Sequence, residues 1–390
     1  MTRLKITAVT GSRADFGIMR WLLQDIANDA DLELTLIVTG THLEVAHGNT
    51  VDEIVASGLP IAARVPIALT DDSPRGIAQS MALALTGIAN ALATLRSDLV
   101  LLLGDRFEIM AAAEAAMLCR IPIAHIAGGD VSEGAIDDVI RHAITKMAHL
   151  HFVTNKESAA RVRQMGEEDA RIFVTGSPAL DHLRRSPLVP RDELEVLLDA
   201  RLGQRNILAT FHPETLADDF GLTQLDEMLA AIDAVYAVGD AIWFTKSNAD
   251  SGGVEINRRV EQWSADRDWV RVYPSLGHTN YVALLGLADV VLGNSSSGLY
   301  EAPAVGTATV NIGGRQGGRL TANSVFNAAP ERTAIVDAIS QALAFDRASA
   351  RSPYGDGHAS EKIITAIKAA PPRAELLHKR FTPLCVSGSL

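Results

Sequence analysis

The stretch from Asp98 to Phe152 reads DLVLLLGDRFEIMAAAEAAMLCRIPIAHIAGGDVSEGAIDDVIRHAITKMAHLHF, and it predicts the fold of the whole chain. Its apolar runs at residues 99–103 and 121–126 have the length of buried strands, and each is followed by glycine, acids and a helical pattern. This order is typical of a parallel α/β sheet, which presents polar side chains where its strands end. The acids expected in one cleft are Asp105, Glu108, Asp130, Glu133, Asp137 and Asp138.

Length and composition narrow the class of protein. The chain has 390 residues, more than one ordinary core supports, so two domains are expected. Hydrophobic residues make up 47% and aromatic residues 5%, a balance that favours helices packed on buried strands over a β-sandwich. The net charge of -12, without a block of lysine or arginine, disfavours nucleic acid as a partner.

Other features point to a metal-free protein of the cytoplasm. Cys119 and Cys385 lie far apart and have no ligand-spaced neighbour, so neither a disulfide scaffold nor a structural zinc site is predicted. No apolar run approaches the roughly 20 residues that span a bilayer, so no membrane partner is expected. Residues 4–9 are too short for a signal-peptide core and are interpreted as the first strand of a cytoplasmic protein.

Strand and helix patterns alternate along almost the entire chain. They predict two doubly wound, Rossmann-like α/β domains facing a cleft, because the short connections require right-handed parallel crossovers. Two prolines among polar residues at 186–192 mark the boundary, so the domains are residues 1–186 and residues 187–370. The tail at residues 371–390 is either frayed or packed back on the first domain. The predicted strands are residues 5–10, 32–39, 99–103, 121–126, 151–154, 171–175, 206–211, 241–245, 269–273, 290–292 and 308–312.

The second half carries turns suited to phosphate. The sequence GNSSSG at 293–298 lies between a strand and a helix beginning near Leu299, where backbone N–H groups and hydroxyls attract an anion. Glu301 either accepts hydrogen bonds from a ribose diol or caps the helix. A second turn, GGRQGGR at 313–319, follows the next strand, and its arginines can reach the same anion. Two such turns favour phosphate binding over a simple cap.

Two further residues stand at strand ends that face the predicted cleft. Arg13 follows the first strand in a glycine-serine turn and suits an anion, although a surface salt bridge with Asp15 is the alternative. His212 ends the first strand of the second domain, and Pro213 biases it to an extended geometry that leaves its ring facing the cleft. The alternative is a strand-end histidine satisfied by backbone groups.

The helix predicted at residues 135–149 separates Asp137 from Asp138. Ile136, Ile140, Ala143 and Met147 recur at helical spacing and predict the stripe that faces the core. Asp137 borders this stripe, so it is the acid expected to be partly desolvated and tuned. A solvated pair with Arg141 one turn later is the alternative.

Taken together, the motifs resemble those of the hydrolysing UDP-N-acetylglucosamine 2-epimerases, which open sialic- and legionaminic-acid-type biosynthesis. The resemblance spans about residues 5–325 and implies a GT-B-like fold with neither metal nor nicotinamide cofactor. The motifs that carry it are GSRADFG at 11–17, GDRFE at 104–108, HIAGGDVSEGAIDDVIRHAITK at 125–146, GSPALD at 176–181, FHPET at 211–215, GNSSSGLYEAP at 293–303 and RQGGR at 315–319.

The resemblance also implies a reaction. A UDP-activated 2-acetamido sugar loses UDP by elimination across C1–C2, water adds at C1, and a proton returns to C2 from the opposite face. Two acid/base groups and cationic help for the diphosphate are then needed. By resemblance, Asp105 and Asp137 are the acid/base groups, and His212 lies near the diphosphate. The implied nucleotide contacts are Arg13, Ser295, Ser296, Glu301 and Arg315, and less directly Asn248. Asp181 is secondary, since an aspartate that opens a helix is more often a cap.

One position departs from the family pattern. Some members carry a glutamate immediately before the Gly-Gly pair, where this chain has Ala127, which cannot transfer a proton. Asp130 or Glu133 must then cover that function, or water must. Asp130 is favoured because it stands at the end of a strand.

Several alternatives stay open at this point. A non-hydrolysing 2-epimerase would re-add UDP to the same intermediate, and a GT-B-like glycosyltransferase would pass the sugar to an acceptor. A non-catalytic sensor would need neither Asp105 nor Asp137 as acids. The sugar is UDP-N-acetylglucosamine or a 6-deoxy 2,4-diacetamido relative, and the base is uracil or guanine. A homodimer is expected from the apolar helix at residues 74–95, for which burial in the sheet is the alternative.

Overall fold

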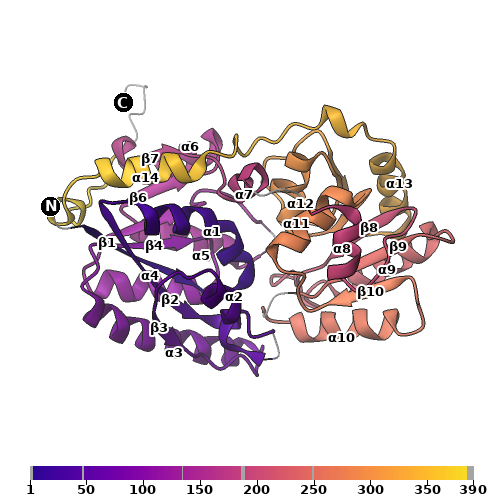
Figure 1. Ribbon diagram of the computed structural model, residues 1–390, viewed down its shortest axis with the longest axis horizontal. Coiled ribbons are helices and arrows are strands. Elements are labelled where there is room, and N and C mark those ends of the chain that lie inside the picture. Colours follow the sequence, from indigo (N-terminus) through magenta and orange to yellow (C-terminus); the bar gives the residue numbers. More distant parts are fainter. Residues whose placement is uncertain (1–2, 46–47, 134, 186–188, 248–249, 384–390) are drawn as a thin grey trace, which may run out of the picture.

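The computed structural model describes residues 3–45, 48–133, 135–185, 189–247 and 250–383, and it contains two parallel sheets side by side (Figure 1). The first sheet has seven strands in the order β3-β2-β1-β4-β5-β6-β7. Ile6 pairs with Leu99 and Val100 pairs with Ile123, so β1, β4 and β5 end at one edge. The strands are β1 Leu4–Thr10, β2 Leu32–Thr39, β3 Ile61–Val65, β4 Leu99–Leu103, β5 Ile123–Ile126, β6 Leu150–Val153 and β7 Ile172–Val174.

Helices cover both faces of the first sheet, because successive residues of its strands point to opposite sides. Leu101 packs with α1 in one core cluster, and its neighbours Val100 and Leu102 pack with α3 and α4 in another. The helices are α1 Arg13–Asn28, α2 Val51–Ala56, α3 Pro74–Leu95, α4 Phe107–Leu118, α5 Asp137–Met147, α6 Lys156–Gln164 and α7 Ala179–Arg185, with 3-10 turns at Gly40–Leu43 and Asp169–Arg171.

The second sheet repeats this plan with six strands in the order β10-β9-β8-β11-β12-β13. Gly293 pairs with Thr210, so β8 and β11 also end at one edge. The elements are α8 Arg191–Leu197, β8 Asn206–Thr210, α9 Leu222–Val235, β9 Ala241–Thr245, α10 Gly253–Ser264, β10 Val270–Tyr273, α11 His278–Leu287, β11 Val290–Gly293, α12 Ser297–Tyr300, η4 Ala302–Val305, β12 Ala308–Ile312, β13 Val325–Ala328, α13 Arg332–Leu343 and η5 Arg347–Ser349. The predicted pair of doubly wound domains is confirmed.

Sequence patterns missed one edge strand in each sheet. Along β3, Ile61 and Ala63 are only partly buried while Ala62 and Arg64 are exposed, and Pro60 and Pro66 flank the strand. Strand β13 at Val325–Ala328 has a mostly unburied pattern too. Edge strands lack the continuous apolar run that marks a central strand, so the pattern used to find the others was absent.

The chain returns to the first domain at its C-terminal end. Helix α14, Ala359–Ala369, packs against α1, and Figure 1 shows it lying over the first domain. Ile363 and Ile367 of α14 belong to the same core cluster as residues of β1, and so does Leu376 of the short helix α15, Arg373–Leu376. The prediction had assigned residues up to 370 to the second domain, whereas this segment packs on the first. The predicted boundary itself includes residues 186–188, which lie outside the described part of the chain.

Helix α3 passes a length and composition test for crossing a membrane, contrary to the expectation that no such run exists, and 28% of its most apolar window is buried. It packs on α4 and β3 and contributes Ala84, Ile88 and Leu92 to the core. A core helix of a globular protein passes the same test, so length and composition alone support no membrane assignment here.

Candidate active site

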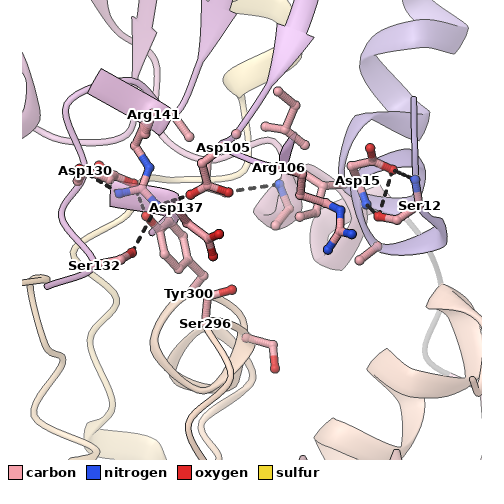
Figure 2. Close-up of a pocket in the computed structure, with 18 of the residues that line it drawn as sticks. Ser12, Asp15, Asp105, Arg106, Asp130, Ser132, Asp137, Arg141, Ser296 and Tyr300 are labelled. Carbon is pink, nitrogen blue, oxygen red and sulfur yellow. Dashed lines mark hydrogen bonds and ion pairs between the residues drawn. The ribbon is translucent and has the colours of Figure 1, made fainter. Parts of the chain in front are cut away.

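A cleft lies where the strand ends of both domains face each other. One hollow of the cleft is lined by acids of the first domain and by hydroxyl groups of the second. A second hollow shares Arg106, His212, Ser296 and Glu301 with it, so the two are continuous. Figure 2 shows Asp105 and Asp137 entering the first hollow from the first domain, with Ser296 and Tyr300 of the second domain opposite. This is the position at which doubly wound folds bind ligands.

Asp105 follows β4 and lines the first hollow. Its carboxylate pairs with the guanidinium of Arg141, which is fully buried. Burial lowers the pKa of His125 to about 4, so its ring is neutral at pH 7 and donates from Nε2 to the Gly104 carbonyl oxygen at 2.8 Å. The charge of Asp105 is thus balanced, and the backbone before it is held in place.

Asp137 stands in the first turn of α5 and has a different environment. Its side chain is 17% exposed, and Arg315 Nη2 lies 3.3 Å from its carboxylate. Burial, with repulsion from Asp250, raises the pKa of Asp137 to about 6 despite the nearby arginines. Asp137 can therefore exchange a proton near neutral pH, as an acid/base group must.

The face of α5 that carries Asp137 was predicted wrongly. Ile136, expected in the core, is 50% exposed, and the buried residues of the helix are Arg141, Ile144 and Thr145. Arg141 is buried because it pairs with Asp105 rather than with Asp137. Asp137 lies one turn before Arg141, on the same side of the helix, and therefore faces the cleft. Its partial burial was predicted, but from an apolar stripe that does not form the buried face of the helix.

Asp138 and Asp15 have local structural contacts. Asp138 accepts from the backbone N–H of Ser132 at 2.6 Å and lies near Arg141 and His142. Asp15 forms a capping box with Ser12 at the start of α1. Asp15 therefore does not pair with Arg13, and the alternative prediction of a salt bridge between them is wrong.

Asp130 and Glu133, the candidates to replace the missing glutamate, occupy different surroundings. Asp130 lines the hollow, and its Oδ1 accepts from Thr154 Oγ1 at 2.7 Å and from Ser158 Oγ at 2.5 Å. Glu133 is exposed, lies against Gly317 and Gly318, and is not among the residues that line the hollow. The structure does not bring Glu133 into the cleft, and a catalytic role for it has no geometric basis.

The serine turn of the second domain is built for close approach of a ligand. A side chain at Gly293 would collide with the Thr210 carbonyl oxygen at 1.9 Å, so only glycine lets the turn form. Ser295 and Ser296 both line the cleft. The helix expected near Leu299 is a single turn, α12, so hydroxyl and backbone groups rather than a long helix dipole would hold an anion.

Arg315 joins the two domains at this turn. It lies 3.3 Å from the Asn294 carbonyl oxygen, which accepts from Nη1, and the same guanidinium reaches Asp137. Asn294 also holds the backbone of His212 through bonds of 2.7 and 2.8 Å. Burial lowers the pKa of His212 well below its ordinary value, so the ring in the cleft is neutral. Burial raises the pKa of Glu301, which lines both hollows, to about 7.

The three remaining predicted site residues have different surroundings. Arg13 lines the second hollow and pairs with Glu53. Asp181 is a cap, but of α14: it accepts from the N–H groups of Ala359 at 2.8 Å and Ser360 at 2.6 Å. Asn248 lies outside the described residues.

Sequence reasoning missed Arg106 as a site residue. Its guanidinium lines both hollows, pairs with buried Glu108 at 2.6 Å and lies 3.3 Å from Asp250 of the second domain. Its position directly after Asp105, at the end of a predicted strand, was the sequence feature that could have identified it. Among the described residues, no group of three or more His, Cys, Asp or Glu side chains could hold a metal ion.

Comparison with known proteins gives the family. Residues 24–368 match the family described as UDP-N-acetylglucosamine 2-epimerase. The chain is 36% identical over 328 residues to "GDP/UDP-N,N'-diacetylbacillosamine 2-epimerase (hydrolyzing)" of Campylobacter jejuni, covering 84% of this chain and 85% of that protein. It is 34% identical over 375 residues to "UDP-N,N'-diacetylbacillosamine 2-epimerase (hydrolyzing)" of Legionella pneumophila, covering 96% and 98%.

Solved structures agree on the fold. A UDP-GlcNAc 2-epimerase of Methanocaldococcus jannaschii, in complex with UDP-GlcNAc and UDP, superposes with a TM-score of 0.79 at 15% identity, over 94% of this chain and 100% of that one. The sequence matches extend over nearly the full length of this chain and its relatives. The chain therefore belongs to the UDP-N-acetylglucosamine 2-epimerase family.

Proposed function

We propose that this chain is a hydrolysing 2-epimerase, which converts a UDP-activated 2-acetamido sugar into the free manno-configured sugar and UDP. One observation carries the proposal: Asp105 and Asp137 of one domain line the same hollow as Ser296 and Arg315 of the other. Acid/base groups and an anion site thus face a single ligand, as an elimination that expels a diphosphate requires.

The second domain and Arg106 supply the stabilisation of the leaving group. As the C1–O bond breaks, negative charge gathers on the diphosphate, and Arg106 and Arg315 are two of the cations that line the cleft. The hydroxyl groups of Ser295 and Ser296 add donors, and the neutral His212 can donate without competing for a second charge. Donors fixed before reaction stabilise such charge without reorganisation.

The first domain supplies proton transfer. One carboxylate takes the proton from C2 as UDP leaves, water adds its oxygen at C1 of the glycal, and a proton returns to C2 on the other face. The sum is substrate plus water giving free sugar plus UDP, with C2 inverted. Asp137, whose pKa of about 6 lets it hold or release a proton, and Asp105, fixed by Arg141, are the two groups.

The names of the relatives support a particular sugar. Two relatives, at 36% and 34% identity, are named for N,N'-diacetylbacillosamine. A relative at 38% identity is named only as the polysialic acid biosynthesis protein P7 of Escherichia coli, and a Neisseria meningitidis relative named for UDP-N-acetylglucosamine is 31% identical. We therefore propose a 2,4-diacetamido-6-deoxy sugar on UDP as substrate, with a product that feeds nonulosonic acid synthesis of the legionaminic type. We also propose a cytoplasmic homodimer that associates through the exposed side of α3, where Leu83 is 49% exposed.

Product analysis tests this function. The purified protein is incubated with UDP-N,N'-diacetylbacillosamine, its GDP analogue or UDP-N-acetylglucosamine. The products are separated by chromatography, their masses are measured by mass spectrometry, and the configuration at C2 is read by proton NMR. We expect free nucleoside diphosphate and free manno-configured sugar in equal amounts, fastest with the first substrate. An epimerised sugar still bound to UDP would indicate the non-hydrolysing reaction, and transfer to an added acceptor without inversion at C2 would indicate a glycosyltransferase.

A further inference from the structure

Among the hydrogen bonds that join the two domains in the cleft, one links Asp130 to Tyr300. Asp130 follows β5 of the first domain, and Tyr300 ends α12 of the second, 170 residues later in the chain. The phenol of Tyr300 donates to Asp130 Oδ2, and both residues line the first hollow, as Figure 2 shows. This bond ties the loop between β5 and α5 to the turn that carries Ser296 and Glu301.

The surroundings of Asp130 make it a hydrogen-bond acceptor. Its side chain is buried, and Thr154, Ser158 and Tyr300 each donate a hydroxyl hydrogen to it. Three donors directed at one carboxylate occupy lone pairs that a general base would need. Asp130 was the candidate to replace the family glutamate at Ala127, and its contacts point to a different task.

The ring of Tyr300 is held by two neighbouring side chains. The ring of Tyr354 stacks on it with centroids 3.8 Å apart, and the guanidinium of Arg319 lies 5.5 Å from its centroid. Arg319 itself donates to Ser132 Oγ at 2.6 Å and to the Val131 carbonyl oxygen at 2.7 Å. With the ring held by these contacts, the hydroxyl of Tyr300 is directed across the cleft to Asp130.

We propose that Tyr300 and Asp130 form an interdomain latch that positions the two halves of the active site for reaction. The latch holds the serine turn of the second domain at a fixed place relative to Asp137, so Asp130 acts as a positioning residue and not as an acid or base. This inference rests on the proposed function for its effect on turnover, but the latch itself is independent of the substrate.

Hydrogen exchange of the protein without ligand tests the latch first. The backbone N–H of Glu133 donates to the Gly317 carbonyl oxygen across the domains at 3.3 Å, and that of Ile136 donates to Thr215 Oγ1 at 2.9 Å, so these amides report interdomain contact. Because a hydrogen bond to a charged group is lost, Tyr300→Phe should make peptides around residues 131–137 exchange about 10- to 100-fold faster.

Tyr273→Phe is the matched control. It removes a partly buried phenol of the second domain that donates to the Leu198 carbonyl oxygen at 3.1 Å, lies outside the residues that line the two hollows, and leaves the Tyr300–Asp130 bond intact. Exchange around residues 131–137 should stay as in the wild type. Unchanged exchange in Tyr300→Phe, or equal acceleration in both variants, would overturn the latch. Since no substrate is present, this outcome does not depend on the proposed epimerase activity.

Turnover then separates positioning from proton transfer. Asp130→Asn keeps an oxygen acceptor and should retain kcat/KM within about 10-fold of wild type, with an unchanged pH profile, whereas Asp130→Ala should lose about 10- to 100-fold. Adding Tyr300→Phe to Asp130→Ala should cost nothing more, because the same bond is already gone. Equal losses of about 100- to 10,000-fold in Asp130→Asn and Asp130→Ala, with a missing limb in the pH profile, would assign Asp130 to acid/base catalysis instead.

Discussion

The strand ends of the two domains meet at one cleft but are built differently. At the first edge, charged side chains gather and most are balanced locally: Asp105 by Arg141, and Glu108 by Arg106. At the second edge, glycine, serine hydroxyls and backbone groups predominate around Gly293. Burial raises the pKa of both Glu108 and Asp137, but Asp137 lines the hollow, and its arginine neighbour Arg315 comes from the other domain. The first edge is therefore arranged for proton transfer, and the second edge is arranged for binding an anion.

The largest effect is expected from the first edge. Asp137→Asn should lower kcat by about 100- to 10,000-fold, because Asn occupies the same space but cannot exchange the proton. The affinity for UDP, measured by calorimetry, should not fall, since the serine turn is intact and Arg315 loses only an anionic neighbour. Asp138→Asn, one residue away and bonded to Ser132, is the control and should keep most of the turnover. Comparable losses in both variants would erase the distinction between the two acids.

Changes at the second edge should weaken UDP binding rather than proton transfer. The Ser295→Ala/Ser296→Ala double variant should weaken UDP binding by about 10- to 100-fold, since hydrogen bonds to a charged group are lost. Ser264→Ala, on a surface helix of the same domain, serves as the control. UDP affinity that survives the double variant, alongside a fall in turnover alone, would mean that the serine turn is not the anion site.

Stability should also distinguish Asp137. Its pKa of about 6 lies above the unfolded value of 3.8, so the folded state binds more protons than the unfolded state between these values, and stability is lost as pH rises through that range. Asp137→Asn should therefore raise the free energy of unfolding by about 3 kcal/mol at pH 8, a gain that vanishes near pH 4. Urea denaturation at the two pH values measures it, and a destabilised variant at pH 8 would contradict the assignment.

The smallest effect concerns Glu301. Its pKa of about 7 means that the carboxylate forms as pH rises through neutrality, and only the charged form is a pure acceptor for a ribose diol. UDP affinity should therefore fall about fivefold between pH 8 and pH 6. This change is smaller than the loss expected when one hydrogen bond to a charged group is removed completely. Glu301→Gln should bind UDP with no such pH dependence. A slope that persists in Glu301→Gln would assign it to another group.

Much of this arrangement followed from local pattern. Central strands are buried on both faces and therefore appear as apolar runs, and polar residues after them must lie at the same edge of a parallel sheet. Asp105, His212 and Ser296 were found in this way. The edge strand Ile61–Val65 was missed because half of its residues face solvent.

Other features depend on partners that are distant in sequence. Periodicity treats arginine as an exposed residue, so it could not foresee that Arg141 is buried by its pair with Asp105, and the core face of α5 was misassigned. The bond from Tyr300 to Asp130 spans 170 residues, and no local spacing encodes it. Sequence could thus place the chemical groups at the cleft, but not say which charges are already balanced there.

Proton NMR of the product formed in heavy water tests the central claim most directly, that acids of one domain act on a sugar whose diphosphate is held by the other. With UDP-N,N'-diacetylbacillosamine, the account predicts free UDP and a free manno-configured sugar that carries one deuterium at C2. Release of UDP with a gluco-configured sugar that retains its C2 proton would show simple hydrolysis and would contradict the account.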